Sequence, residues 1–428
     1  MNISPARTAA FDILYRIETE RAFSSILLPQ YEANLSPGDR GLCHQLVLGV
    51  LRRQMLLDRI IEILSNNRKL DAAVRISLRL GLFQLKFLDR IPAHSAVNES
   101  VNLVHRAKKS SARSFVNALL RRATRESIEP EYASEIERVS IETSHPRWLI
   151  EKWIGQFGLE EAAALAAANN EPPGAAFRFT SGTSSETSGV RPSQLVRGAF
   201  LADSVTPELT DLFTAGMIYF QDEASQLVGR CVRLSPGDRF LDVCAAPGSK
   251  ITQIASIFGS KKHFFAAGEL HAHRARLLTE NCRVQNADVS VFQYDAEDAL
   301  PFGKESFDSV MVDAPCSGTG TIRHNPEIRY FLDPSDFDKL SGKQLRILRN
   351  ASNLVRKGGR LLYSTCSLER EEDEDVAEAF LASDPRFSKV SPDLPDHFLG
   401  PKGYARTFPH RDRMDGFFIA EFVRIGTD

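Results

Sequence analysis

The sequence predicts a multidomain protein with an all-α N-terminal domain (1–140), a small α+β middle domain (141–235) and an α/β domain (236–428). Three observations predict it. A chain of 428 residues is too long for one ordinary hydrophobic core. Apolar residues recur at helical spacing through the first domain. From residue 236 on, short apolar runs alternate with amphipathic stretches, which is typical of a parallel, doubly wound sheet.

The composition is that of a globular protein, with 43% hydrophobic and 25% charged residues. No apolar run reaches the length that a bilayer span needs, so we expect no membrane association. The N-terminus lacks the apolar core of a signal peptide, which favours a cytoplasmic location. The six cysteines form no CxxC pair, so we expect neither a zinc site nor any other metal, and no disulfide framework.

The charge is divided unevenly along the chain. Residues 1–125 hold 20 Lys and Arg against 10 Asp and Glu, whereas the rest holds 33 against 45. A basic first domain indicates a polyanionic partner such as nucleic acid, although a solvated basic face explains the charge equally well. The candidate phosphate contacts crowd one region: Arg106, Lys108, Lys109, Arg113, Arg121, Arg122 and Arg125.

Local signals place several elements of the first two domains. Asp71 is a plausible cap for a helix that carries Val74, Leu78 and Leu82 on one face. The low-complexity stretch 181–189 predicts a mobile surface loop in the middle domain.

In the α/β domain, apolar runs predict the strands and periodic stretches predict the helices. The expected strands are Arg239–Cys244, Phe264–Ala267, Val289–Phe292, Ser309–Val312, Arg360–Tyr363 and, late in the chain, Gly416–Val423. The expected helices include His273–Val284 and Ser335–Val355.

Two of these strands deliver a cysteine each. Cys316 follows the strand that ends at Val312, and Cys366 follows the strand that ends at Tyr363. Ligands bind at the carboxyl edge of an open parallel sheet, so the pair suggests thiol chemistry in one crevice. Taken singly, each cysteine is better explained as a small buried hydrophobe.

The loop after the first strand predicts a nucleotide-like cofactor. It runs Cys244-Ala245-Ala246-Pro247-Gly248-Ser249-Lys250, and Gly248 lets the backbone approach a ligand closely. Glu269 ends the second strand, where a carboxylate can hold the two hydroxyls of a ribose. Asp295, after the third strand, is expected on the adenine side. Because the GxGxxG pattern of dinucleotide sites is absent, the loop favours S-adenosylmethionine over NAD.

The first domain resembles a known RNA-binding family. The stretch 90–102 and the stretch 115–121, Phe-Val-Asn-Ala-Leu-Leu-Arg, are similar to the helical domain of the NusB type. More narrowly, they resemble the version fused to bacterial rRNA methyltransferases of the RsmB/Sun kind.

The α/β domain resembles the NOL/NOP/Sun family, which are S-adenosylmethionine-dependent RNA cytosine-5 methyltransferases. Four stretches carry the resemblance: 244–250, 313–318, 364–367 and 414–420. The resemblance implies a Rossmann-like class I methyltransferase domain that acts on 16S rRNA, and it covers essentially the whole chain. We expect RNA and no DNA as partner, and a monomer.

The resemblance also implies roles for the site residues. Carbon 5 of cytosine is a poor nucleophile until a thiolate adds at carbon 6. The family assigns that attack to Cys366 and assistance with release to Cys316. Asp313 is placed to hydrogen-bond the base, and Lys250 to orient Asp313 or lower a thiol pKa. The cofactor-binding group is the loop 244–250 with Glu269, Arg274, Asp295 and Asp313.

The chain departs from the family pattern at four places. Ser249 replaces a second glycine, and Glu269 replaces the usual aspartate. Asp373, within Glu372-Asp373-Glu374, and the pair Arg329-Tyr330 also differ, and we expect these last two departures to alter RNA contacts. The alternatives are the same chemistry on tRNA, or a non-catalytic RNA-binding or antitermination factor.

Overall fold

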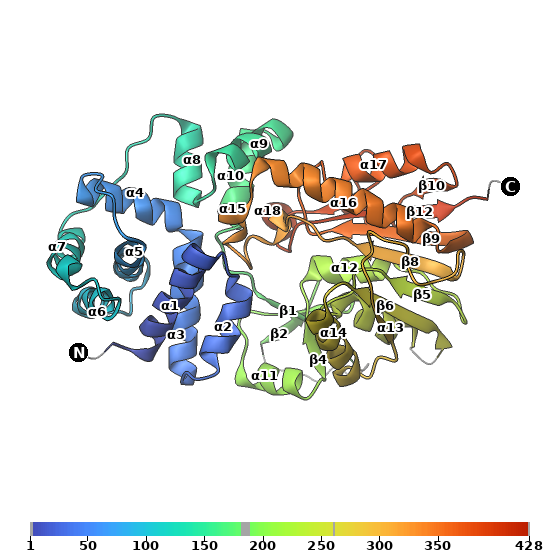
Figure 1. The fold of residues 1–428 in the computed structure, drawn as a ribbon, viewed down its shortest axis with the longest axis horizontal. Helices are drawn as coiled ribbons and strands as arrows, with labels where there is room; N and C mark the ends of the chain where they lie inside the picture. The colour runs from blue at the N-terminus through green and yellow to red at the C-terminus, as the bar shows by residue number, and fades with distance from the viewer. Residues whose placement is uncertain (1–2, 181–188, 260–261, 427–428) are drawn as a thin grey trace. The chain divides into compact units, whose positions relative to one another are not determined.

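The computed structural model describes residues 3–180, 189–259 and 262–426 and divides into two compact units (Figure 1). The first unit consists of Met1–Pro172 and Ile322–Leu332, and the second of Pro173–Thr321 and Asp333–Asp428. The boundaries at 140/141 and 235/236 stay predictions. The loop predicted at 181–189 lies, apart from Gly189, outside the described residues.

The first unit is built of helices around one central helix, as predicted for its N-terminal part. Its helices are α1 (Pro5–Glu20), α2 (Ser24–Glu32), α3 (Pro37–Arg52), α4 (Gln54–Ser65), α5 (Ala72–Phe87), α6 (Ala93–Arg106), α7 (Arg113–Ala123), α8 (Glu135–Thr143), α9 (Arg147–Phe157), α10 (Leu159–Ala168) and α15 (Ile328–Phe331). Helix α5 is buried on nearly all sides, which is typical of a core helix. Asp71 caps it by accepting from the N–H of Ala73 at 3.0 Å. Among the described residues, no helix is both long and apolar enough to cross a membrane.

The basic cluster of the first unit is partly neutralised. Arg106 pairs with Asp12 at 2.6 Å, and Lys109 pairs with Asp71 at 2.8 Å. Arg122 pairs with Glu126 one helical turn on, at 2.7 Å. The net positive charge of the cluster is therefore smaller than its count of Lys and Arg residues suggests. Surface ion pairs of this kind contribute little to the free energy of unfolding.

The segment Ile322–Leu332 folds with the first unit, although the residues before and after it in the sequence belong to the second unit. Arg329, which is fully buried, donates from Nη1 to the carbonyl oxygen of Thr143 and to Oδ1 of Asn170, both at 2.9 Å. The Tyr330 hydroxyl donates to the carbonyl oxygen of Leu51 at 2.7 Å. Both side chains are thus committed to internal hydrogen bonds, and the expectation that Arg329-Tyr330 alters RNA contacts stays a prediction.

The second unit holds a small and a large sheet. The small one has the order β2-β3-β1-β4 and is antiparallel throughout. Its strands are β1 (Ala175–Phe179), β2 (Val190–Pro192), β3 (Phe200–Ala202) and β4 (Ile218–Phe220), with α11 (Pro207–Thr214) before β4. Phe177 and Ile218 are buried in its core.

The large sheet has the order β10-β12-β9-β8-β5-β6-β7, with β11 paired to β12. Its strands are β5 (Arg239–Asp242), β6 (Phe264–Glu269), β7 (Ser290–Gln293), β8 (Phe307–Asp313), β9 (Val355–Thr365), β10 (Phe387–Val390), β11 (Ala405–Thr407) and β12 (Phe417–Arg424). The five strands from β9 to β7 are parallel, which confirms the α/β fold. One edge of the sheet is antiparallel, because β12 runs antiparallel to both β9 and β10, so the sheet is mixed.

Helices cover both faces of the large sheet (Figure 1). Besides α11, the described helices of this unit are α12 (Glu223–Cys231), α13 (Ser249–Phe258), α14 (Ala272–Val284), α16 (Pro334–Ser352), α17 (Glu374–Ser383) and α18 (Pro409–Asp412). One core packs α12, α13 and α14 against side chains such as Phe240 and Met311. The other packs α16 and α17 against their strand neighbours Leu241 and Val310. Successive strand residues thus serve opposite cores, as the pleat requires.

The parallel register sets the carboxyl ends of β5, β8 and β9 side by side. Asp242 lies opposite Met311, and Asp313 lies opposite Ser364. The loops that leave these three strands therefore start at one edge of the sheet, and they carry three of the four sequence motifs of the α/β domain.

Replacing Arg329 tests whether 322–332 is a structural part of the first unit. Arg329→Met keeps the length of the side chain but leaves its acceptors unpaired, so we expect a loss of about 3 kcal/mol in the free energy of unfolding. Urea unfolding measures it. The control is Arg147→Met, which removes an exposed arginine that pairs with Glu151 on the same helix and should change stability by about 0.5 kcal/mol or less. Equal stability of the two variants would contradict this account.

Candidate active site

The structure brings the two predicted cysteines together. Cys316 follows β8 and Cys366 follows β9, and their Sγ atoms lie 2.9 Å apart. The backbone N–H of Cys366 also points at Sγ of Cys316, at 3.3 Å. Both are free thiols and both are half-buried. Two nucleophilic sulfurs thus share one spot at the carboxyl edge of the sheet.

The surroundings of the two thiols hold a proton on Cys316. The hydrogen bond with Cys366, burial, and the nearby Cys366, Glu372 and Asp313 raise the pKa of Cys316 well above its ordinary value. Because the thiolate is the reactive form, a cysteine with such a pKa is a weak nucleophile at neutral pH and is suited to hold and donate a proton.

Asp313, at the end of β8, is held on both of its oxygens. Lys250 Nζ donates to Oδ2 at 2.8 Å, and Ser364 Oγ donates to Oδ1 at 2.8 Å. Burial alone would lower the pKa of Lys250, but the charge and hydrogen bond of Asp313 raise it above its ordinary value. Lys250 is therefore a fixed cation that orients Asp313, which is one of the two roles expected for it.

The two cysteines and several of the residues predicted to bind the cofactor line one cavity of about 260 Å³. The predicted residues that line it are Cys244, Ala246, Glu269, Arg274, Asp295, Asp313, Cys316 and Cys366. The other loop residues, Ala245, Pro247, Gly248, Ser249 and Lys250, do not line it and form the turn behind it. The thiol end and the carboxylate end are thus parts of one cavity.

The carboxylates at the far end of this cavity are fixed by backbone and by Arg274. Glu269 is buried, and its Oε1 accepts the N–H of His271 at 2.9 Å. Arg274 lies 3.6 Å from Glu269 Oε2 and donates to the carbonyl oxygen of Ala246 at 2.9 Å. Asp295 Oδ1 accepts the N–H of Glu297 at 2.9 Å. Arg274 therefore links the end of β6 to the loop that follows β5.

Gly248 turns the loop into helix α13. Its φ of +108° lies in the left-handed region, and an added Cβ would come within 2.8 Å of Leu278 Cδ1. The carbonyl oxygen of Pro247, just before it, accepts from Asn281 Nδ2 at 2.8 Å. Ser249, where the family has a second glycine, is the first residue of α13 and needs no positive φ. The serine is therefore compatible with the turn.

Glu372, a residue that sequence reasoning did not place in the site, holds the two cysteine loops together. It is fully buried and accepts from the N–H and Oγ of Ser317 and from Oγ of Ser367. Gln344 of α16 donates to it as well, at 2.9 Å. Ser317 and Ser367 each follow one of the cysteines. No pattern in the sequence marks this acid, because two of its partners, Ser317 and Gln344, are distant along the chain.

Asp373 is also buried, and the expectation that it alters RNA contacts stays a prediction. It accepts from Thr365 Oγ1 and pairs with Arg406 at 2.8 Å. The departure from the family pattern therefore acts on the packing between β9 and β11.

Other cavity residues were missed as well. His271, Tyr294, Lys343 and Ile347 line it. Lys343 and Ile347 lie one turn apart on α16, a spacing that would have placed both on one helix face.

Asp242, at the end of β5, is a buried carboxyl whose pKa is raised to about 8 by burial and by the charge of Asp313.

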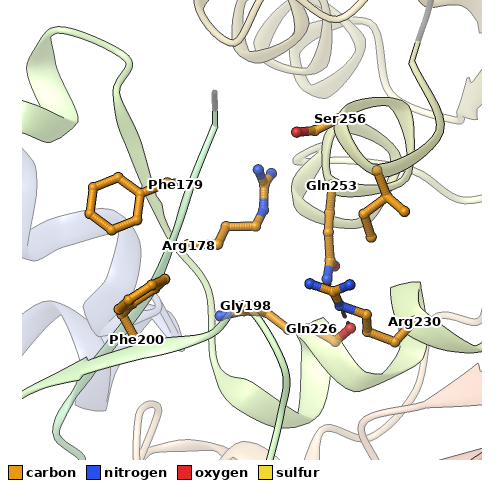
Figure 2. Close-up of a pocket in the computed structure, with 9 residues that line it drawn as sticks. Arg178, Phe179, Gly198, Phe200, Gln226, Arg230, Gln253 and Ser256 are labelled. Atoms are coloured by element: carbon orange, nitrogen blue, oxygen red, sulfur yellow. Dashed lines mark hydrogen bonds between the residues drawn. The ribbon is translucent and has the colours of Figure 1, made fainter. Parts of the chain in front are cut away.

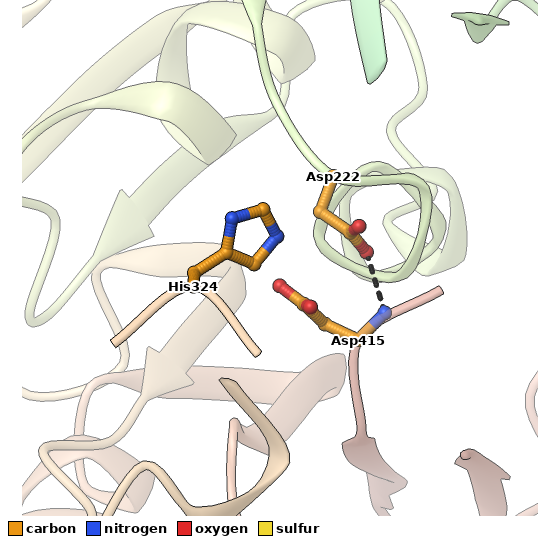
Figure 3. Close-up of side chains that lie close together, drawn as sticks. All are labelled: Asp222, His324 and Asp415. Atoms are coloured by element: carbon orange, nitrogen blue, oxygen red, sulfur yellow. Dashed lines mark hydrogen bonds between the residues drawn. The ribbon is translucent and has the colours of Figure 1, made fainter. Parts of the chain in front are cut away.

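The last motif stretch, 414–420, is anchored to the start of α12. The N–H of Asp415 donates to Oδ1 of Asp222 at 2.9 Å, as Figure 3 shows. The same oxygen caps α12 by accepting from the N–H of Ala224 at 2.9 Å. The N–H of Gly416 donates to the carbonyl oxygen of Gly320 at 2.8 Å, and the N–H of Gly320 donates to that of Cys366 at 2.9 Å. The motif thus supports the loop between the two cysteines.

Two families match the sequence. The family described as 16S rRNA methyltransferase RsmB/F matches residues 230–423, and the NusB family matches residues 4–125. Both matches agree with the resemblances expected from the motifs.

Curated proteins match over their full length. The chain is 32% identical over 456 residues to the "Probable ribosomal RNA small subunit methyltransferase B" of Bacillus subtilis, with 100% of both chains covered. It is also 32% identical to the "Ribosomal RNA small subunit methyltransferase B" of Thermus thermophilus, again with 100% of both covered.

Solved structures share the fold. The structure titled "Crystal Structure of PH0851" superposes with a TM-score of 0.82 at 25% identity and covers 99% of each chain. NSun6 from Pyrococcus horikoshii superposes with a TM-score of 0.58 at 20% identity, over 66% of this chain and 99% of its own.

Glu372→Ala tests the link between the cysteine loops. It leaves two serine hydroxyls and one backbone N–H without their acceptor, so we expect a loss of about 3 kcal/mol of stability. The two thiols should also react faster with an aromatic disulfide reagent, because their loops are no longer joined. The matched control is Glu378→Ala on α17, whose exposed side chain pairs with Lys402. If both variants showed wild-type stability and thiol reactivity, Glu372 would not hold the loops.

Proposed function

Because the chain belongs to the RsmB/F family of 16S rRNA methyltransferases, we propose that it methylates carbon 5 of a cytosine in that rRNA, through a covalent adduct with Cys366. Its methyl donor is S-adenosylmethionine. The observation that carries the proposal is the pair of cysteine sulfurs 2.9 Å apart beside Asp313.

The methylation of carbon 5 requires both a nucleophile and a second group that assists release, which two thiols can supply. The carbon 5 of cytosine becomes nucleophilic once a thiolate has added to carbon 6, because the addition makes it part of an enamine. The bound cofactor supplies an electrophilic methyl group on its sulfonium. The base must then lose its proton at carbon 5 and expel the sulfur from carbon 6. One thiol therefore attacks, and a second group assists the proton transfers of release.

The family resemblance, rather than a pKa, divides the roles of the two thiols. It assigns the attack on carbon 6 to Cys366. In the release step a base takes the proton from carbon 5 while the carbon 6–sulfur bond breaks and Cys366 leaves as a thiolate, and Cys316, whose Sγ lies 2.9 Å from that of Cys366, is the group proposed to assist this step.

Asp313 is the group proposed to hold the base. Lys250 and Ser364 each occupy one lone pair of its carboxylate, and the remaining lone pairs can accept from the exocyclic amine or a protonated ring nitrogen of cytosine. Such a bond favours the protonated ring, which accepts the thiolate more readily. The target base must leave its stack to reach this cavity.

The residues at the other end fit S-adenosylmethionine. Glu269 keeps one oxygen, Oε2, directed away from its backbone bond and available for the hydroxyls of the ribose. Asp295 and the apolar Leu270 and Ile347 line the same cavity and suit an adenine. Arg274 is proposed as a positioning residue, since it holds both Glu269 and the loop carbonyl of Ala246.

The first unit is proposed to contribute RNA affinity. Its NusB-type sequence and its excess of 20 Lys and Arg over 10 Asp and Glu in residues 1–125 support this role. The same chemistry on tRNA remains the alternative substrate, and a non-catalytic RNA-binding factor is the alternative without chemistry.

Substituting the cysteines one at a time tests the mechanism. Cys366→Ala should abolish methyl transfer and form no adduct. Cys316→Ala should still attack and methylate but release slowly, so a protein–RNA adduct should accumulate. The measurement is a denaturing gel after incubation with labelled rRNA and S-adenosylmethionine.

The matched control is Cys282→Ala, since Cys282, a residue of α14, is buried in the core and does not line the cavity. It should behave as the wild type. An adduct with Cys366→Ala and none with Cys316→Ala would reverse the roles. Full activity of both variants would remove the cysteines from the mechanism and leave them as packing residues.

A further inference from the structure

The second unit holds another cavity, separate from the active site. It measures about 320 Å³ and lies where β1 and β3 of the small sheet meet α12 and α13 (Figure 2). The side chains that define it are those of Arg178, Phe179, Phe200, Arg230, Gln253 and Ser256. It shares no lining residue with the cavity of the cysteines.

Arg178 is buried and only partly satisfied. Its side chain is 3% exposed, and Nε donates to Gln221 Oε1 at 2.8 Å. Nη2 donates to Thr252 Oγ1 at 2.8 Å and to Gln285 Oε1 at 2.7 Å. Nη1 is buried and has no partner. Arg178 lines the cavity, and in the view of Figure 2 its guanidinium lies between Phe179 and Gln253.

Arg230 approaches the cavity from α12. Its Nε is likewise buried without a partner. Gly198, whose φ is +81°, leaves room for the guanidinium, because a Cβ at that position would collide with Nη2 of Arg230. The chain thus combines a glycine and an arginine so that a second cation reaches the same cavity.

Among the residues that the structure describes, no carboxylate forms an ion pair with Arg178 or Arg230. Burial lowers the pKa of Arg178 to about 10, and burial together with the charge of Arg197 lowers the pKa of Arg230. Buried charges in proteins are normally paired, so the buried Arg178, with the half-buried Arg230 as a second cation beside it, makes this cavity suited to an anion.

We propose that this cavity binds a phosphate group of the RNA backbone. The arginine fork matches the oxygens of a phosphate, and guanidinium–phosphate hydrogen bonds are among the strongest in proteins. Phe179 and Phe200, with ring centroids 4.9 Å apart, give the cavity an apolar wall for the sugar or base attached to that phosphate. A free phosphate offers the same oxygens but no group for this wall. The inference rests on the proposed function, which supplies RNA as the substrate.

The position of Arg178 gives such a contact a use. Nη2 also donates to the carbonyl oxygen of Ser249 at 3.2 Å, at the start of α13. The next residue, Lys250, holds Asp313 in the active site. A backbone phosphate in this cavity would therefore be fixed against the same helix that orients the catalytic carboxylate.

Two variants test the site without disturbing Arg178, whose bonds hold the fold. Arg230→Gln removes one cation, and Ser256→Glu places a carboxylate at the exposed rim, where it competes with a phosphate. The control is Arg276→Gln, an exposed arginine on α14 that lines neither cavity. The probes are inorganic phosphate, followed by phosphorus NMR line broadening, and a 16S rRNA fragment, followed by filter binding over a range of salt concentrations.

For both probes we expect roughly ten-fold weaker binding in Arg230→Gln and Ser256→Glu than in the control. The slope of the logarithm of RNA affinity against that of salt should fall by about 1 in Arg230→Gln. In the wild type, the rRNA fragment should displace inorganic phosphate.

Three results would overturn the proposal. The first is equal phosphate binding by the two variants and the control. The second is phosphate that stays bound when RNA saturates the protein, which would assign the cavity to a free phosphate. The third is unchanged RNA affinity in both variants. Failure of the proposed function is distinguishable, because it would appear as a wild type that binds rRNA and phosphate but transfers no methyl group.

Discussion

The carboxylate of Asp313 is the point on which the active site depends. Lys250 holds one of its oxygens and Ser364 the other, both at 2.8 Å. These residues come from the loop after β5, the end of β8 and the end of β9, so one side chain fixes the carboxyl ends of three parallel strands. Taking an ion pair out of water is costly unless its geometry is good and its other bonds are satisfied. The bonds of Asp313 to Lys250 and Ser364 therefore fix the relative positions of these strand ends, and with them the positions of the two thiols.

The two cysteines follow from this constraint. Cys316 lies three residues after Asp313, and Cys366 lies two residues after Ser364, so a fixed Asp313–Ser364 contact brings both sulfurs to the same place. Glu372 then ties the residues that follow each cysteine. The proximity that raises the pKa of Cys316 is thus a consequence of backbone geometry and of one buried acid.

The sequence was sufficient for the features that follow from local patterns. The apolar runs located the parallel strands, and the rule that ligands bind at their carboxyl ends placed Cys316, Cys366 and Glu269 around one crevice. Asp71 could be identified as a helix cap because a cap depends on its immediate neighbours.

Features that depend on distant partners could not be predicted. Arg329-Tyr330 and Asp373 are polar, and a polar residue at a surface and one buried with hydrogen-bonding partners look alike in a sequence. The role of Glu372 depends on Ser317, which lies far away along the chain. The antiparallel edge formed by β12 is equally hidden, since a strand's apolar pattern does not record its direction.

The paired thiols are proposed to direct a methyl group to carbon 5 of cytosine. The most direct measurement is to incubate the purified protein with unmodified 16S rRNA and methyl-labelled S-adenosylmethionine, digest the RNA to nucleosides and separate them by liquid chromatography with mass spectrometry. We expect the methyl label in 5-methylcytidine. Label in any other nucleoside, such as a cytidine methylated on its exocyclic nitrogen, would contradict it, because that reaction needs no thiol adduct at carbon 6.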